Sequence, residues 1–410
     1  MEFKHKQLDN GLDIIGEVNP SAKSAAVGFF VKTGARDETQ EINGVSHFLE
    51  HMLFKGTDKL NAFEVNQAFD RTGAQFNAFT SEENTVFYSA ILPEYVIEIT
   101  KLWAQLMRPA LRTEDFDIEK NVIKEEIAMY QDMPNFDSIE RCKTLHFDNH
   151  PCGYSVLGSV ESIDNLTADQ MRAYFENRYA PNNITLACAG NFDWEQICIA
   201  AKESCGSWLK KTVTRDLTDY PGSGRKERVE KDSVTREHLC LMSSGVSAQD
   251  PSRYAAMLLA NIVGDDVGSR FFWELVDKAI AETASMQFGA MDGTGFFCSY
   301  ILCGSQNMEK VLDIVHRIFD ELSKEGVTEN ELIKAKNKVL SELVIKNELP
   351  MGRLIDLGFS WTYHKRYFKI EDEVKAIKDV TIEEIKSLIE QLKPGDFTQL
   401  ILGPRKNMDE

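Results

Sequence analysis

Short runs of apolar and β-branched residues predict the first strands of this chain. Leu12–Glu17 and Ser24–Val31 are rich in such residues and are separated by a turn at Asn19-Pro20-Ser21. Gln75–Thr80 and Thr85–Leu92 repeat the pattern across a short polar connection, which predicts a hairpin. A sheet built largely from neighbouring antiparallel strands is therefore expected in this part of the chain.

Helical patterns surround these strands. A helix is predicted from about Gly44, and a second over Phe63–Arg71, where Gly73 can close the C-terminus. Pro93–Met107 and Thr113–Met133 predict two more helices. Strands come in runs and helices come in runs, which favours an α+β fold over a doubly wound parallel sheet.

The middle of the chain has a different composition. Lys210–Glu237 is polar and charged and contains Pro221-Gly222-Ser223-Gly224, which is typical of a linker. A length of 410 residues also suits two domains better than one core. We therefore expect a first domain over residues 1–213, a linker over 214–236 and a second domain over 237–410.

The two halves resemble each other in sequence. Thr381 lies 214 residues after Thr167, and Gly403 lies 213 residues after Gly190. The same spacing relates further pairs: Pro181 to Pro394, and Lys120-Asn121 to Lys336-Asn337. An internal duplication explains this constant spacing, although a shared helix-then-strand order could produce part of it.

Candidate chemistry is concentrated in the predicted helix after Gly44. His47, Glu50 and His51 form an HxxEH pattern, and these positions share one helical face. Two imidazoles one turn apart suit tetrahedral zinc, and Glu50 can reach a water on the metal without being a ligand. With eight histidines in the chain, a chance occurrence is expected at roughly one or two per cent. The alternative is a helix face with two hydrogen-bonded histidines and a salt-bridging glutamate.

A catalytic zinc normally has three protein ligands, so a third must come from elsewhere. The segment Asp117–Ile127 offers Glu119, Glu125 and Glu126, of which the first and last are seven residues apart and share a face. The residues alone leave all three open as candidates. A solvated acidic helix face is the alternative.

Charge and cysteine usage narrow the partners and the compartment. A net charge of −19 argues against nucleic acid and anionic membranes; it favours neutral or basic peptides, or simply serves solubility. The eight cysteines show no CxxC pairing and lie mostly in apolar runs, as reduced buried thiols do. The charged start of the chain lacks an apolar signal region. We expect a cytoplasmic protein.

Several longer runs together resemble the M16 metallopeptidases, the inverted-motif zinc peptidases that include pitrilysin, insulin-degrading enzyme and the mitochondrial processing peptidase. The matching runs are NGVSHFLEHMLFKGT, GAQFNAFTSEENTVFY, EKNVIKEE and YAPNNITLACAGN. The likeness is greatest to the processing-peptidase (M16B) branch and extends over nearly the whole chain. It implies a LuxS/MPP-like metallohydrolase fold, with two homologous α+β domains in tandem, each an antiparallel-rich sheet packed with helices.

The resemblance also implies roles for the acidic residues. Glu126 would be the third zinc ligand, since the family places it some 75 residues after the second histidine. Glu119 would be the glutamate that orients a ligand and supports catalysis, and Glu125 a solvated neighbour. Glu50 would take a proton from water and pass it to the leaving amine.

The family binds substrate by adding an extended peptide to the edge strand that corresponds to Gln75–Thr80. Asn77, Ala78 and Phe79 are the substrate-binding residues that this implies. The predicted activity is zinc-dependent endopeptidase cleavage of peptides or unfolded segments inside a chamber. The alternative is a non-catalytic or weakly active scaffold subunit, like the core proteins of respiratory complexes that resemble this family.

One departure from the family concerns partners. Active members carry, on a helix of the second half, an arginine and a tyrosine seven residues later that bind substrate and stabilise the oxyanion. The corresponding positions here are Val276 and Thr283, after Ser269-Arg270. We therefore expect a weak peptidase as a single chain, and a dimer. The dimer would be either a homodimer or a heterodimer with a homologous chain that supplies the missing pair.

Overall fold

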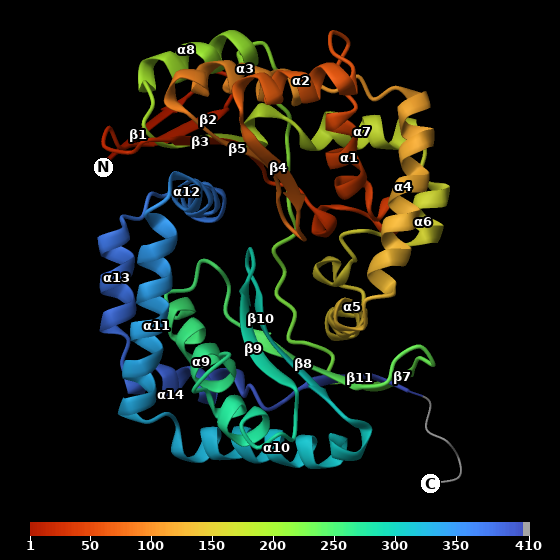
Figure 1. Cartoon of the computed structure of the whole chain (residues 1–410), viewed down its shortest axis with the longest axis vertical. Coiled ribbons are helices and arrows are strands. Elements are labelled where there is room, and N and C mark those ends of the chain that lie inside the picture. Colours follow the sequence, from red (N-terminus) through yellow and green to blue (C-terminus); the bar gives the residue numbers. More distant parts are fainter. Residues whose placement is uncertain (405–410) are drawn as a thin grey trace. The chain divides into compact units, whose positions relative to one another are not determined.

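The computed structural model describes residues 1–404, which divide into two compact units (Figure 1). The first unit consists of Met1–Ile127, Tyr154–Asp216 and Val344–Lys369; the second consists of Ala128–Gly153, Leu217–Leu343 and the chain from Ile370 onward. The units thus differ from the expected stretches 1–213 and 237–410, because each half of the chain gives one helical segment to the other unit.

The first unit contains a six-stranded sheet in the order β1-β2-β6-β3-β5-β4. Neighbouring strands are antiparallel except β2 and β6, which are parallel. The edge strand β4 pairs with β5 alone. The strands are β1 (Glu2–Gln7), β2 (Asp13–Val18), β3 (Ala25–Val31), β4 (Gln75–Thr80), β5 (Thr85–Ile91) and β6 (Ile184–Gly190).

Eight α-helices accompany this sheet, and two of them begin or end at predicted glycines. Gly44 precedes α1 with φ of 94°, and Gly73 ends α2 with φ of 64°, values that favour glycine. The helices are α1 (Val45–Phe54), α2 (Ala62–Thr72), α3 (Val96–Leu106), α4 (Thr113–Gln131), α6 (Val160–Asn165), α7 (Ala168–Arg178), α8 (Trp194–Cys205) and α12 (Pro350–His364).

The second unit contains a five-stranded sheet in the order β7-β11-β8-β10-β9, with β7 and β11 parallel. Its strands are β7 (Lys226–Glu230), β8 (Glu237–Gly245), β9 (Thr283–Ala290), β10 (Gly295–Cys303) and β11 (Thr398–Gly403). Its helices are α5 (Pro134–Phe147), α9 (Arg253–Gly264), α10 (Met308–Glu325), α11 (Glu329–Asn347), α13 (Ile370–Asp379) and α14 (Ile382–Leu392).

The two sheets have the same topology once β1 is set aside. Replacing β2, β6, β3, β5 and β4 by β7, β11, β8, β10 and β9 reproduces the second order, including the parallel pair. Side-chain contacts repeat as well: Lys120 Nζ donates to the Leu166 carbonyl at 2.9 Å, and Lys336 Nζ to the Val380 carbonyl at 2.5 Å. The predicted α+β fold with two homologous domains is confirmed.

The two exchanged helices, α5 and α12, are anchored by buried charges. On α12, Arg353 pairs with Glu17 of β2 at 2.8 Å, and both side chains are almost fully buried. On α5, Asp137 pairs with Lys231, just after β7, at 3.1 Å. Apolar residues of α12, among them Leu354, also pack on the first sheet, where Figure 1 shows the blue helix beside the red strands.

The polar segment that predicted a linker is more ordered than expected. It contains strand β7, whose charged and largely exposed residues gave no strand pattern. Arg215 is buried with Asp37 and Glu83 of the first unit, and Ser223 Oγ donates to the Leu145 carbonyl of the second. No helix within residues 1–404 is both long and apolar enough to cross a membrane.

Candidate metal centre

The helix α1, which carries the HxxEH pattern, is fixed at its N-terminus by a buried carboxylate. Glu38 accepts hydrogen bonds from the backbone N–H groups of Gly44 and Ser46, both at 2.7 Å. Burial raises the pKa of Glu38 to about 7, although these hydrogen bonds favour its charged form. Ser46 Oγ is also hydrogen-bonded to the buried Tyr174 hydroxyl at 2.7 Å. The first turn before His47 is therefore held by three contacts.

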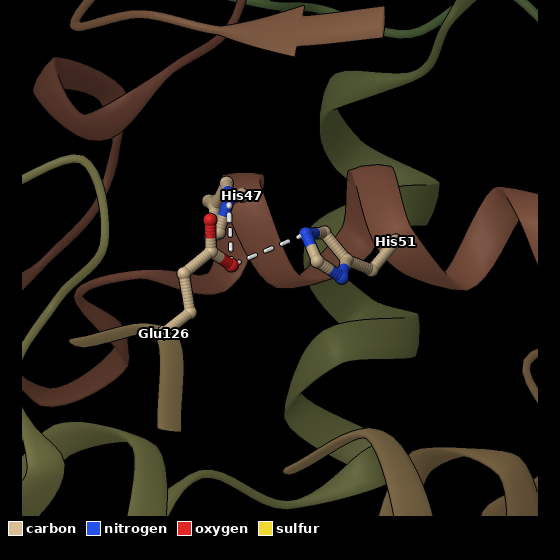
Figure 2. Close-up of side chains that lie close together, drawn as sticks. All are labelled: His47, His51 and Glu126. Atoms are coloured by element: carbon tan, nitrogen blue, oxygen red, sulfur yellow. Dashed lines mark ion pairs between the residues drawn. The ribbon is translucent and has the colours of Figure 1, made fainter. Parts of the chain in front are cut away.

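Three predicted ligands converge between α1 and α4. One donor atom from each of His47, His51 and Glu126 lies within 4.8 Å of the other two, the only such group found among the described residues. Glu126 Oε2 lies 3.7 Å from His47 Nε2 and 3.5 Å from His51 Nε2, and Figure 2 shows this oxygen facing both rings. These separations exceed hydrogen-bond length. They match the roughly 3.4 Å expected between ligands that share one tetrahedral zinc.

The state of His47 supports a metal ligand over a structural histidine. Its ring is 8% exposed, yet it makes no hydrogen bond to any residue in the described part of the chain, and Nδ1 is buried without a partner. Buried polar groups are normally hydrogen-bonded. Burial, and then the nearby charge of His51, lower the pKa of His47 to about 3, so the ring stays neutral and keeps a lone pair. The residues present fit a zinc ion.

Glu119 supports the second histidine rather than joining the ligand group. Its Oε1 lies 2.8 Å from His51 Nδ1, and Lys55 forms an ion pair with its other oxygen. Burial alone would raise the pKa of Glu119, but the hydrogen bonds from His51 and Lys55 lower it below its usual value. This contact leaves His51 Nε2 directed at Glu126. Glu125 lies on the exposed side of α4.

Glu50 lies beside the ligand group without belonging to it. Its side chain is 9% exposed, and Oε2 accepts a hydrogen bond of 2.6 Å from Thr80 Oγ1. Burial raises the pKa of Glu50, against the hydrogen bond from Thr80, which favours the charged form. A carboxylate with a raised pKa next to a candidate metal site suits proton transfer.

The predicted substrate residues lie on β4. Asn77 is exposed, Ala78 is 9% exposed and Phe79 is half-buried. The Ala78 N–H donates to the Asn77 side-chain oxygen at 2.9 Å, so a side chain of the strand itself occupies this backbone donor. An extended peptide that pairs with Ala78 would replace this contact.

Three supporting residues had no signal in the sequence pattern. Glu38, Lys55 and Thr80 reach the site only through the fold: they come from the approach to α1, the end of α1 and the end of β4. The prediction that Val276 and Thr283 lie on one helix is wrong. The π-helix Phe272–Val276 ends at Val276, and Thr283 is the first residue of β9.

Comparisons with known proteins agree with this geometry. A model of the insulinase family, peptidase family M16, matches residues 13–159, and a model of the peptidase M16 inactive domain matches residues 165–339. The uncharacterized zinc protease YmxG of Bacillus subtilis is 29% identical over 408 residues, with 99% of each chain covered. The chain belongs to peptidase family M16.

Solved structures share the fold along nearly the full length. A protease from Helicobacter pylori superposes with a TM-score of 0.90 at 21% identity, covering 98% of this chain and all of that one. A chain of complex III2 from Candida albicans superposes with a TM-score of 0.83 at 18% identity, covering 98% and 95%. At these identities the likeness concerns the fold alone.

Proposed function

We propose that this chain is a zinc-dependent endopeptidase whose metal is held by His47, His51 and Glu126. The observation that carries the proposal is the convergence of three donor atoms beside a fourth acidic group, Glu50, that is not among them. Zinc in such a site acts as a Lewis acid that polarises a substrate carbonyl and makes water acidic near neutral pH.

Glu50 is the proposed general base. With Oε2 engaged by Thr80, Oε1 is the atom that takes the proton from the attacking water and returns it to the leaving amine. Glu119 and Lys55 keep His51 in one ring orientation, so that Nε2 rather than Nδ1 faces the metal.

The substrate is proposed to be a peptide or unfolded segment in extended conformation. It adds to the free edge of β4 along Asn77, Ala78 and Phe79, using main-chain hydrogen bonds that many sequences can supply. Because strand addition needs no chain end, internal bonds are cleaved. This mode supports the processing-peptidase type, and the free cysteines support a cytoplasmic location.

The test is a comparison of wild type with Glu50→Gln on an internally quenched peptide library, with zinc measured on both proteins. Hydrolysis should fall by about 10²–10⁴-fold while zinc stays near one per chain, because the amide keeps the shape but accepts no proton. Glu125→Gln, on the exposed side of α4, is the matched control and should retain activity. Loss of zinc from Glu50→Gln would show that Glu50 is a ligand.

We further propose that the efficient enzyme is a dimer. Val276 packs against the apolar core of the second unit and Thr283 offers a short exposed side chain, so neither replaces an arginine or a tyrosine. A homologous chain could supply both groups, in a heterodimer or in place of a homodimer partner. Strong hydrolysis by the purified chain, unchanged by any added homologue, would contradict the heterodimer.

A scaffold subunit is the second candidate function. The fold shared with a chain of complex III2 and the two missing side chains favour it. The four converging site residues favour the peptidase, since a scaffold has no need for them. Bound zinc without hydrolysis of any unfolded peptide would decide for the scaffold.

A further inference from the structure

We propose that Thr80 is a positioning residue that ties the general base to the strand that receives the peptide. The inference rests on the proposed function, because it assigns a role around Glu50 and β4. It concerns one contact: the hydrogen bond of 2.6 Å from Thr80 Oγ1 to Glu50 Oε2.

Thr80 is the only hydrogen-bond partner of Glu50 within residues 1–404. Glu50 is 9% exposed, so few other groups can restrain its carboxylate. A carboxylate has two equivalent oxygens, and one short hydrogen bond is enough to decide which of them stays free. The Thr80 hydroxyl therefore selects Oε1 as the proton-accepting atom and fixes the plane of the carboxylate.

The strand β4 gives Thr80 its second role. Thr80 is the last residue of this edge strand and lies opposite Thr85 of β5, while Asn77 and Ala78 lie on the same strand. A peptide that adds to the free edge of β4 is therefore placed by the same short segment that places the base. The distance between peptide and base is set by one rigid strand rather than by two independent elements.

Buried contacts hold the end of this strand in place. In the turn after Thr80, the Ser81 N–H donates to the Asn84 carbonyl at 2.8 Å. Glu83 in the same turn is 2% exposed and pairs with Arg36 at 2.7 Å. Threonine itself is stiff about χ1 because it is β-branched. The hydroxyl thus points at Glu50 from a fixed backbone and a restricted rotamer.

The kinetic test uses three variants measured beside wild type and Glu50→Gln. Thr80→Val keeps the shape and removes the hydroxyl, so kcat should fall about ten- to a hundredfold with KM within about twofold. Thr80→Ser restores the hydroxyl and should recover most of the loss. Thr100→Val, which removes a buried hydroxyl bonded within α3, is the control and should leave kcat unchanged. Equal kcat for Thr80→Val and wild type would overturn the inference.

A thermodynamic cycle tests the same contact without activity. Thr80→Val should lower the unfolding temperature of the zinc-free full chain by a few degrees, but have less effect when Glu50 is already alanine. Equal shifts in both backgrounds would overturn the inference. If the cycle shows coupling and the wild type cleaves nothing, the contact stands and the proposed function fails.

Discussion

The two units place different residues on equivalent helices. In the first unit, α1 follows β3 and carries His47 and Glu50, both buried. In the second, α9 follows β8, and its buried positions are apolar throughout, among them Leu258 and Leu259. The candidate site therefore arises by placing polar groups where the duplicated scaffold has core, and each buried charge then needs its own partner, as Glu50 has in Thr80.

The helices α4 and α11 sharpen the same point. Both contain 19 residues, and Glu342 lies 216 residues after Glu126, as Ala335 does after Glu119. Glu342 is an exposed carboxylate, and Ala335 is buried in the apolar core of its unit. A glutamate in this helix position becomes a candidate ligand only where histidines face it, so helix position alone does not define the site.

The largest expected effect separates these two glutamates. Glu126→Gln should weaken zinc binding by about a thousandfold or more, because it removes one of three donors that share about 10–16 kcal/mol of binding free energy. Glu342→Gln and Glu125→Gln should bind zinc as wild type does. Competition with a chelator of known affinity measures all three. A similar loss from Glu125→Gln would move the ligand by one residue.

The next effect concerns the anchors of the exchanged helices. Arg353→Met leaves the buried Glu17 carboxylate without its charge partner, which should lower the free energy of unfolding by about 3–5 kcal/mol. Lys231→Met removes the partner of Asp137, but this lysine is 24% exposed, and the loss should be near 1 kcal/mol. Urea denaturation measures both. Equal losses would show that the two anchors do not differ in burial cost.

A pH dependence should belong to the second unit. His146 on α5 is 1% exposed, and burial lowers its pKa to about 4, whereas Thr362 holds the equivalent place on α12. Between pH 6.5 and 4 the unfolded chain binds a proton that the folded chain refuses, so stability falls as pH falls, by at most about 3 kcal/mol.

His146→Asn removes this titrating group and keeps a polar atom for Thr398. Its unfolding free energy should therefore fall less than that of wild type across the same pH range. Chemical denaturation at several pH values gives the two curves. Parallel curves would exclude His146 as the source.

The smallest expected effect tests the support of His51. Glu119→Gln keeps a hydrogen-bond acceptor for Nδ1 but removes the charge, so zinc affinity should fall about ten- to a hundredfold, less than for Glu126→Gln. The same chelator competition measures it. A loss as large as that of Glu126→Gln would make Glu119 a ligand rather than a supporting residue.

Local sequence patterns predicted the elements that hold the site. The range of β4 matches its predicted range, Gln75–Thr80, and Gly73 ends α2 as expected, because alternation and a glycine cap are local signals. Strands β1 and β7 were missed because both are exposed edge strands with charged residues.

Exchange of helices and the support of the site could not be predicted in the same way. The places of α5 and α12 depend on which sheet buries each helix, which no helical pattern reports. His47, Glu50 and His51 were predicted from their spacing, and the choice of Glu126 needed a family resemblance. Lys55 and Glu119 meet only in three dimensions.

The anchors of α5 and α12 also have a consequence for folding. Arg353 lies 216 residues after Asp137, so the same helix position carries opposite charges, and the sheet-side partners Glu17 and Lys231 are reversed to match. A nascent α5 that docked on the first sheet would bring Asp137 toward Glu17, and α12 on the second would bring Arg353 toward Lys231. Like charges cannot be buried together, so this reversed polarity acts as a sorting code that directs each helix to its sheet.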